Sequence, residues 1–114
     1  MKVRAISDKI YQFIGLSKRA GKLVSGAYSV EQAIKSGKAK LVIISKDAST
    51  NTSKKFTELC KTRGIDIVKI GSKQALGQSI GKPERALLAV TDTSFRDLII
   101  AELPLSTKNM GVIE

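Results

Sequence analysis

The chain has 114 residues, 42% hydrophobic and 26% charged, which suits one folded domain with a core and excludes a disordered composition. Its net charge is +10, from 20 Lys and Arg against 10 Asp and Glu, so an anionic partner is favoured. The sequence has no histidine and one cysteine, Cys60, which excludes an intramolecular disulfide and a cysteine metal cluster and removes the commonest general base.

Hydrophobic periodicity and turn residues predict five helices that alternate with four strands. The helices are expected over residues 8–20, 26–36, 51–63, 72–80 and 93–103. The strands are expected over residues 22–25, 41–45, 65–70 and 86–90. We expect Ser25 to cap the second helix, and Asn51 or Thr52 to cap the third. The alternation predicts an α/β fold, a three-layer α/β/α sandwich with a central mixed four-stranded sheet.

Residues 1–104 are expected to form a single domain, and residues 105–114, beyond Pro104, a C-terminal tail. No segment approaches the roughly 20 apolar residues of a membrane span, and the N-terminus lacks the apolar run of a signal peptide. We therefore expect a cytoplasmic monomer that uses no membrane, cofactor, metal or small-molecule substrate. Without histidine or a cluster of paired carboxylates, no catalysis is expected either.

The most informative stretch runs from Lys22 to Asp47, where Gly26 opens a helix with a polar face. A helical wheel places Tyr28, Gln32 and Lys35 on the side opposite the apolar residues, with Ser29 next to them. Amides and hydroxyls can hydrogen-bond to base edges, and a tyrosine can stack on an unpaired base. This face is therefore predicted to contact RNA bases, and an ordinary solvent-exposed helix is the alternative interpretation.

Basic residues surround this helix, because residues 1–46 hold ten basic and two acidic residues, whereas residues 47–114 hold ten basic and eight acidic ones. Such an asymmetry favours RNA phosphates, while a merely solvated basic face is the alternative. The predicted phosphate contacts are Lys18, Arg19, Lys22 and Lys46. The loop at residues 80–86 is a second candidate, with Lys82 and Arg85 predicted to brace the RNA.

Two further residues have structural interpretations. Cys60 lies on the apolar stripe of its predicted helix and is expected to be core rather than a nucleophile. Asp47 follows a predicted strand and is interpreted as the cap of a turn, with a contact to RNA-bound water as the alternative.

Two segments, GAYSVEQAIKSGKAKLVIISKDAS and the later GSKQALGQSIGKPERALLAV, resemble the kink-turn RNA-binding ribosomal protein family, and in particular its bacterial YlxQ-like branch. The resemblance covers about Phe13–Leu98. It implies the α/β/α fold and binding of structured RNA, such as a ribosomal or riboswitch kink-turn, in a ribosome-associated setting.

The resemblance also implies where RNA would bind. In the family, an Asn-Glu pair at the helix start and a Lys three positions further on contact the tandem sheared G·A pairs of the kink-turn. Tyr28, Ser29 and Gln32 occupy those positions here, while the opening glycine is retained as Gly26. The family loop that packs on the flipped-out nucleotide matches Gly81–Ala86. These departures imply weaker or broader recognition, and they leave open a protein-interaction module that retains the fold without kink-turn specificity.

Overall fold

The computed structural model describes residues 8–104 and 112–113. Helices and strands alternate along this part of the chain, as the sequence predicts. The helices are α1 (Asp8–Arg19), α2 (Ala27–Lys35), α3 (Thr50–Arg63), α4 (Lys73–Ser79) and α5 (Thr93–Ala101). The strands are β1 (Leu23–Ser25), β2 (Leu41–Ile44), β3 (Ile67–Lys69), β4 (Leu87–Val90) and β5 (Val112–Ile113).

The strands form one mixed sheet in the order β1-β4-β2-β3-β5. Strand β4 runs antiparallel to both β1 and β2, whereas β3 runs parallel to β2 and to β5. The mixed four-stranded sheet predicted from the sequence is therefore present as β1–β4. Strand β5 adds two residues at its edge, from the segment predicted to be a tail; residues 105–111 and 114 of that segment lie outside the described residues.

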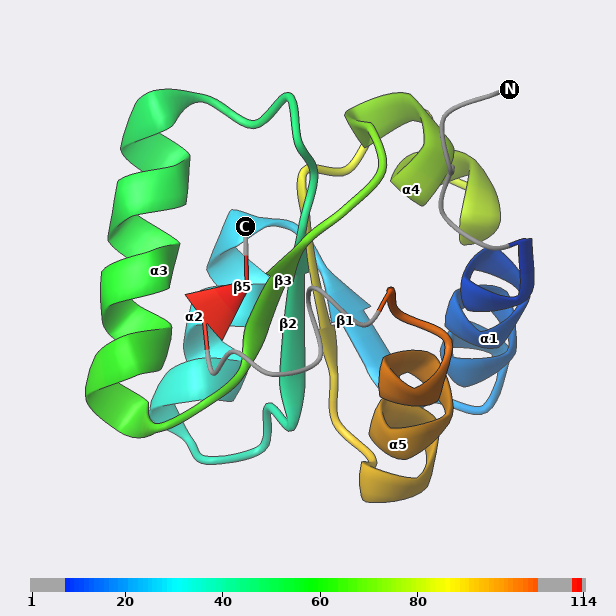
Figure 1. Cartoon of the computed structure of the whole chain (residues 1–114), viewed down its shortest axis with the longest axis horizontal. Helices are drawn as coiled ribbons and strands as arrows, with labels where there is room; N and C mark the ends of the chain where they lie inside the picture. The colour runs from blue at the N-terminus through cyan, green and yellow to red at the C-terminus, as the bar shows by residue number, and fades with distance from the viewer. Residues whose placement is uncertain (1–7, 105–111, 114) are drawn as a thin grey trace.

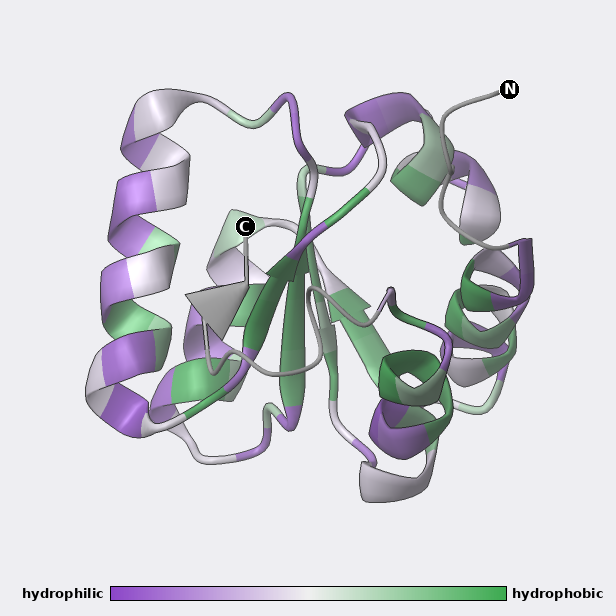
Figure 2. Ribbon diagram, viewed as in Figure 1, coloured by the Kyte–Doolittle hydropathy of each residue, from purple (hydrophilic) through white to green (hydrophobic). Residues whose placement is uncertain are grey.

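The helices cover both faces of the sheet, so the predicted three-layer sandwich is confirmed (Figure 1). Helices α2 and α3 pack on one face, and α1, α4 and α5 pack on the other. The central strands are coloured hydrophobic in Figure 2, as expected for strands buried on both sides. Within the described residues, no helix has the length and apolarity needed to cross a bilayer.

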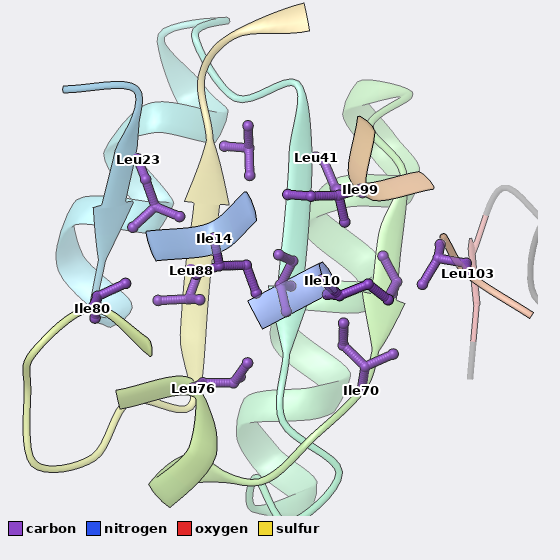
Figure 3. Packing of buried hydrophobic residues seen from close by; sticks show 13 residues of the cluster. Ile10, Ile14, Leu23, Leu41, Ile70, Leu76, Ile80, Leu88, Ile99 and Leu103 are labelled. Atoms are coloured by element: carbon purple, nitrogen blue, oxygen red, sulfur yellow. The ribbon is translucent and has the colours of Figure 1, made fainter. Parts of the chain in front are cut away.

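Each face of the sheet has its own hydrophobic cluster. Figure 3 shows the cluster under α1, where Ile10 and Ile14 lie among sheet residues such as Leu41 and Leu88. The cluster under α2 and α3 includes Cys60, which is fully buried. Desolvation raises the pKa of its thiol to about 12, and the negative charge of Asp66 adds to the shift. The predicted core role of Cys60 is confirmed by its full burial in this cluster, and the raised pKa keeps the thiol protonated near neutral pH.

The cap of α3 differs from the sequence prediction. Ser49, rather than Asn51 or Thr52, is the N-cap, and its side chain accepts a hydrogen bond from the backbone N–H of Thr52. The prediction was wrong because the sequence has several hydroxyl and amide residues in a row here, and any of them can cap a helix.

Gly77 allows the loop at residues 80–86 to fold back on α4. A Cβ added at Gly77 would lie 2.8 Å from Cα of Glu84 and 2.9 Å from the carbonyl oxygen of Lys82. Both are backbone atoms, which cannot move aside as a flexible side chain would. The backbone N–H of Lys82 also donates to the carbonyl oxygen of Gly77 at 2.8 Å. The loop position therefore depends on the absence of a side chain at Gly77.

We predict that Gly77→Ala lowers the free energy of unfolding by about 1–3 kcal/mol, because the methyl group overpacks this contact. Urea denaturation measures the change. The matched control is Gln78→Ala on the exposed neighbouring residue, which should stay within about 0.5 kcal/mol of the wild type. Equal unfolding free energies for Gly77→Ala and the wild type would contradict the close packing.

Candidate functional site

Three segments meet at one edge of the sheet. Strands β1 and β2 run parallel and β4 runs between them in the opposite direction, so the ends of β1 and β2 adjoin the start of β4. The backbone N–H of Gly26 donates to the carbonyl oxygen of Leu87 at 3.0 Å. The backbone N–H of Ser45 donates to the carbonyl oxygen of Ala86 at 2.9 Å. We call this region the Gly26 edge: Gly26 with the first turn of α2, the loop at residues 80–86, and the end of β2 through Lys46.

The first turn of α2 lacks a side-chain cap. Its N-cap is Gly26, with φ +93° and no side chain to accept a hydrogen bond, whereas Ser49, Ser72 and Asp92 cap α3, α4 and α5. The first backbone N–H groups of a helix have no partner within it. In α2 these belong to the exposed residues 27–29. The helix start therefore presents partly positive N–H groups to solvent.

Ser25 does not cap α2, so that prediction was wrong. The positive φ of Gly26 turns the chain into the helix, and Ser25 remains in β1, opposite Leu88. Its Oγ instead accepts a hydrogen bond of 3.4 Å from Nε of Arg85. The same guanidinium donates through Nη1 to the carbonyl oxygen of Glu84 at 2.6 Å. Arg85, a predicted site residue, is thereby held beside the start of α2.

The exposed face of α2 is polar and aromatic, as the helical wheel predicts. The residues that pack against the sheet are Val30, Ala33 and Ile34. Tyr28 is 77% exposed, and Ser29 and Gln32 are also exposed. An exposed aromatic ring is costly to hydrate and is available for stacking. The structure thus leaves all three side chains accessible at or near the Gly26 edge.

Glu31 neutralises part of the positive charge on α2. Its carboxylate lies 2.8 Å from Nζ of Lys35 and 3.0 Å from Nζ of Lys55, and these two hydrogen bonds lower the pKa of Glu31. Nη1 of Arg63 donates to the carbonyl oxygen of Lys35 at the far end of the helix. The charge of Lys35 is therefore partly balanced, and the cations of the Gly26 edge come from other elements.

The loop at residues 80–86 lies beside the last turn of α1, so predicted cationic residues of both segments fall close together. Lys82 is exposed on this loop. The last turn of α1 flanks the loop, since Lys18 and Arg19 line a hollow of about 300 Å³ together with Gly81. The predicted residues Lys18, Arg19 and Lys82 therefore lie on one flank of the edge, and Arg85 lies at its centre.

Lys46 and Lys22 lie at opposite ends of the sheet. Lys46 follows β2, is exposed, and donates its backbone N–H to the carbonyl oxygen of Gly71. Lys22 precedes β1, where its carbonyl oxygen accepts from the N–H of Thr91. With a rise of about 3.3 Å per residue, β1 separates the backbone of Lys22 from that of Gly26 by roughly 13 Å. The structure brings Lys46 to the Gly26 edge, whereas Lys22 lies at the opposite end of β1, next to the last turn of α1, where its N–H donates to the carbonyl oxygen of Ser17 at 2.8 Å.

Asp47 contacts the start of α4 rather than its own turn. Its Oδ1 accepts a hydrogen bond of 2.9 Å from the backbone N–H of Lys73, the first residue of α4. The prediction that Asp47 caps its own turn is therefore not confirmed; its side chain instead satisfies a backbone N–H at the start of α4, whose N-cap is Ser72. Among the described residues, no group of three or more Cys, Asp or Glu side chains could hold a metal ion.

The structure also shows contacts that the sequence pattern does not reveal. The Arg85–Ser25 hydrogen bond joins residues 60 positions apart, and Lys54 and Lys69 line one groove from different elements. Only the order of strands places such residues together. The sequence feature that pointed to the contact site of Arg85 was the basic character of the loop at residues 80–86.

Known proteins are similar to this chain over most of its length. Residues 8–100 match the model of the Ribosomal protein L7Ae/L30e/S12e/Gadd45 family. The RNA-binding protein YlxQ of Bacillus subtilis (strain 168) is 42% identical over 93 residues, which cover 82% of this chain and 93% of the relative. The RNA-binding protein YlxQ of Enterococcus faecium is 36% identical over 88 residues, covering 77% and 84%.

Solved structures have the same fold. A protein of unknown function from Bacillus halodurans C has a TM-score of 0.77 and 38% identity, over 81% of this chain and 94% of its own. The Giardia lamblia 15.5kD RNA binding protein has a TM-score of 0.75 over 89% and 87%; at 21% identity its likeness concerns the fold alone. With its family model matched over almost the whole domain, the chain belongs to the ribosomal protein L7Ae/L30e/S12e/Gadd45 family.

Proposed function

We propose that this protein binds structured RNA through the Gly26 edge, and that the RNA is a kink-turn or a related bent element in a ribosome-associated setting. The observation on which the proposal rests is the uncapped first turn of α2, beside the positioned guanidinium of Arg85. The family membership and the names of the two YlxQ relatives support RNA as the ligand.

The phosphate contacts would come from three kinds of donor. The N–H groups of residues 27–29 suit a phosphate oxygen, since a helix start combines free donors with a partial positive charge. Arg85 offers a planar fork of donors that suits phosphate oxygens, and Lys46 and Lys82 offer point charges. Gly26 has no side chain, and the space where a Cβ would stand is open, so an RNA backbone could approach closely.

The base contacts would come from the exposed face of α2. Tyr28 could stack on an unpaired base, which contributes about 1–3 kcal/mol in proteins that bind single strands. Gln32 could donate a hydrogen bond to a guanine edge. Ser29 stands where the family has a glutamate, so an acceptor for guanine amino groups is lost, at a cost of about 1–3 kcal/mol in discrimination. We therefore expect weaker or broader G·A recognition than the family pattern implies.

The proposed activity is binding without catalysis, by a monomer in the cytoplasm. The chain has no histidine to act as a general base, and the Gly26 edge offers cations and neutral polar groups rather than paired carboxylates. The second candidate function is a protein-interaction module that uses the same basic edge for an acidic partner. It is favoured by the replacement of all three base-reading residues by Tyr28, Ser29 and Gln32.

A kink-turn RNA should bind more tightly than the same RNA with its G·A pairs changed to Watson–Crick pairs. The physical reason is that only the bent motif presents sheared guanine edges to the exposed face of α2. A fluorescence titration at fixed salt measures both dissociation constants, because phosphate contacts make affinity strongly salt-dependent. Equal affinities would contradict kink-turn recognition, and failure to bind either RNA would favour the protein-interaction module.

Charge reversal should weaken RNA binding at Lys82 more than at Lys22, since only Lys82 lies in a segment of the Gly26 edge. Loss of one charge-assisted phosphate contact costs about 1.5–3 kcal/mol, which is roughly tenfold to a hundredfold in affinity. Both lysines are exposed, so Lys22→Glu is a matched control for Lys82→Glu with the same change in net charge. An equal or larger loss for Lys22→Glu would place the RNA elsewhere.

A further inference from the structure

A second basic region adjoins the Gly26 edge, in a groove between α3 and the β3 side of the sheet. The groove has a volume of about 780 Å³. Its described lining includes Lys46 at the end of β2, Lys54 and Lys55 on α3, and Lys69 on β3. We call it the α3 groove. It is basic even though the charge of residues 47–114 is nearly balanced along the sequence.

The positive charges of the α3 groove are mostly unbalanced. Lys55 is engaged, because its Nζ lies 3.0 Å from Glu31 and 5.6 Å from the centre of the Phe56 ring. Lys46, Lys54 and Lys69 form no ion pair with any residue that the structure describes. Glu58 is the single carboxylate of the described lining. Gathering three unpaired cations around one carboxylate is unfavourable until an anion enters.

The uncharged part of the lining indicates which chemical groups would fit. Three hydroxyl residues line the groove, and the buried Oγ of one of them, Ser53, has no hydrogen-bond partner among the described residues. A buried hydroxyl without a partner costs free energy, which a ligand oxygen or water could recover. No aromatic residue is among the described lining, so the groove offers no platform for base stacking. Lysines with hydroxyls suit phosphate oxygens rather than bases.

The groove is continuous with the Gly26 edge through Lys46. Neighbouring strands lie about 4.8 Å apart, so the ends of β1 and β2, with β4 between them, are roughly 10 Å apart. Lys46 follows β2 and also lines the groove. Lys69, on the adjacent strand β3, lines the same groove. A polyanion that leaves the start of α2 along the sheet edge therefore meets Lys46 and then the groove.

We propose that the α3 groove is a second RNA-binding site, which holds the phosphate backbone of an arm that extends beyond the element bound at the Gly26 edge. This inference rests on the proposed function, because the ligand of the groove is a continuation of the same RNA. Recognition in the groove is independent of sequence, since only phosphate oxygens are contacted. It would raise affinity for long RNAs while leaving the choice of bent element to α2.

The test compares two doubly substituted proteins on RNAs of two lengths. The groove variant is Lys54→Gln with Lys69→Gln, and the matched control is Lys38→Gln with Lys61→Gln, two exposed lysines outside the described lining of the groove. The probes are a kink-turn RNA with two short arms and two longer RNAs. Each longer RNA has one of the two arms extended by one helical turn. Dissociation constants are measured over a range of salt concentrations, and thermal unfolding checks that each variant is folded. Lys54→Gln alone serves if the half-buried Lys69 does not tolerate substitution.

The wild type should bind one of the extended RNAs more tightly than the short RNA. The groove variant should lose this gain, and its salt slope on the extended RNA should fall by about 1–2, because each lost phosphate contact removes roughly 0.7–0.9. The control should retain the gain, and all three proteins should bind the short RNA alike. Equal binding of the extended RNA by the groove variant and the wild type would overturn the second site alone. A wild type that binds none of the RNAs would overturn the proposed function and the second site together.

Discussion

The pairing of β2 with β4 is the constraint on which the rest of the structure depends. Every residue of both strands is buried, and alternate residues belong to the two hydrophobic clusters on opposite faces of the sheet. A slip of one residue would move each side chain to the other face, so the register is strongly specified. The residues under α1, α4 and α5 are Leu41, Ile43, Leu88 and Val90, and those under α2 and α3 are Val42, Ile44, Leu87 and Ala89.

This register also places the candidate site. Once β4 is fixed against β2, its first residues fall beside the end of β1, and the backbone N–H of Gly26 reaches Leu87. The chain then turns into α2 through the positive φ of Gly26 rather than through a capping side chain. The buried core thus determines where the exposed N–H groups of α2 lie, and Arg85 is placed beside them by the same strand. The surface proposed to bind RNA is a consequence of the central pairing.

Much of the fold could be predicted from the sequence, because apolar periodicity and glycines mark element after element. The five helices and the first four strands lie close to their predicted positions, and the burial of Cys60 followed from its helical stripe. The cap residues could not be predicted, since Ser25 and Ser49 look alike in sequence while only Ser49 caps a helix. The separation of Lys22 from Gly26, in contrast, follows from the predicted strand over residues 22–25, whose rise alone places the two backbones roughly 13 Å apart. The α3 groove combines lysines from three elements, which no local pattern reveals.

Tyr28, Ser29 and Gln32 are exposed on α2 beside its uncapped start, where the proposed base contacts would be made. We propose that RNA contacts the uncapped start of α2. The most direct measurement of this contact is a titration of the isotope-labelled protein with a kink-turn RNA, followed by the NMR shifts of its backbone amides. The largest shifts should fall on residues 27–29 and on the loop at residues 80–86. Largest shifts on α5, with residues 27–29 unchanged at saturation, would contradict the proposed contact.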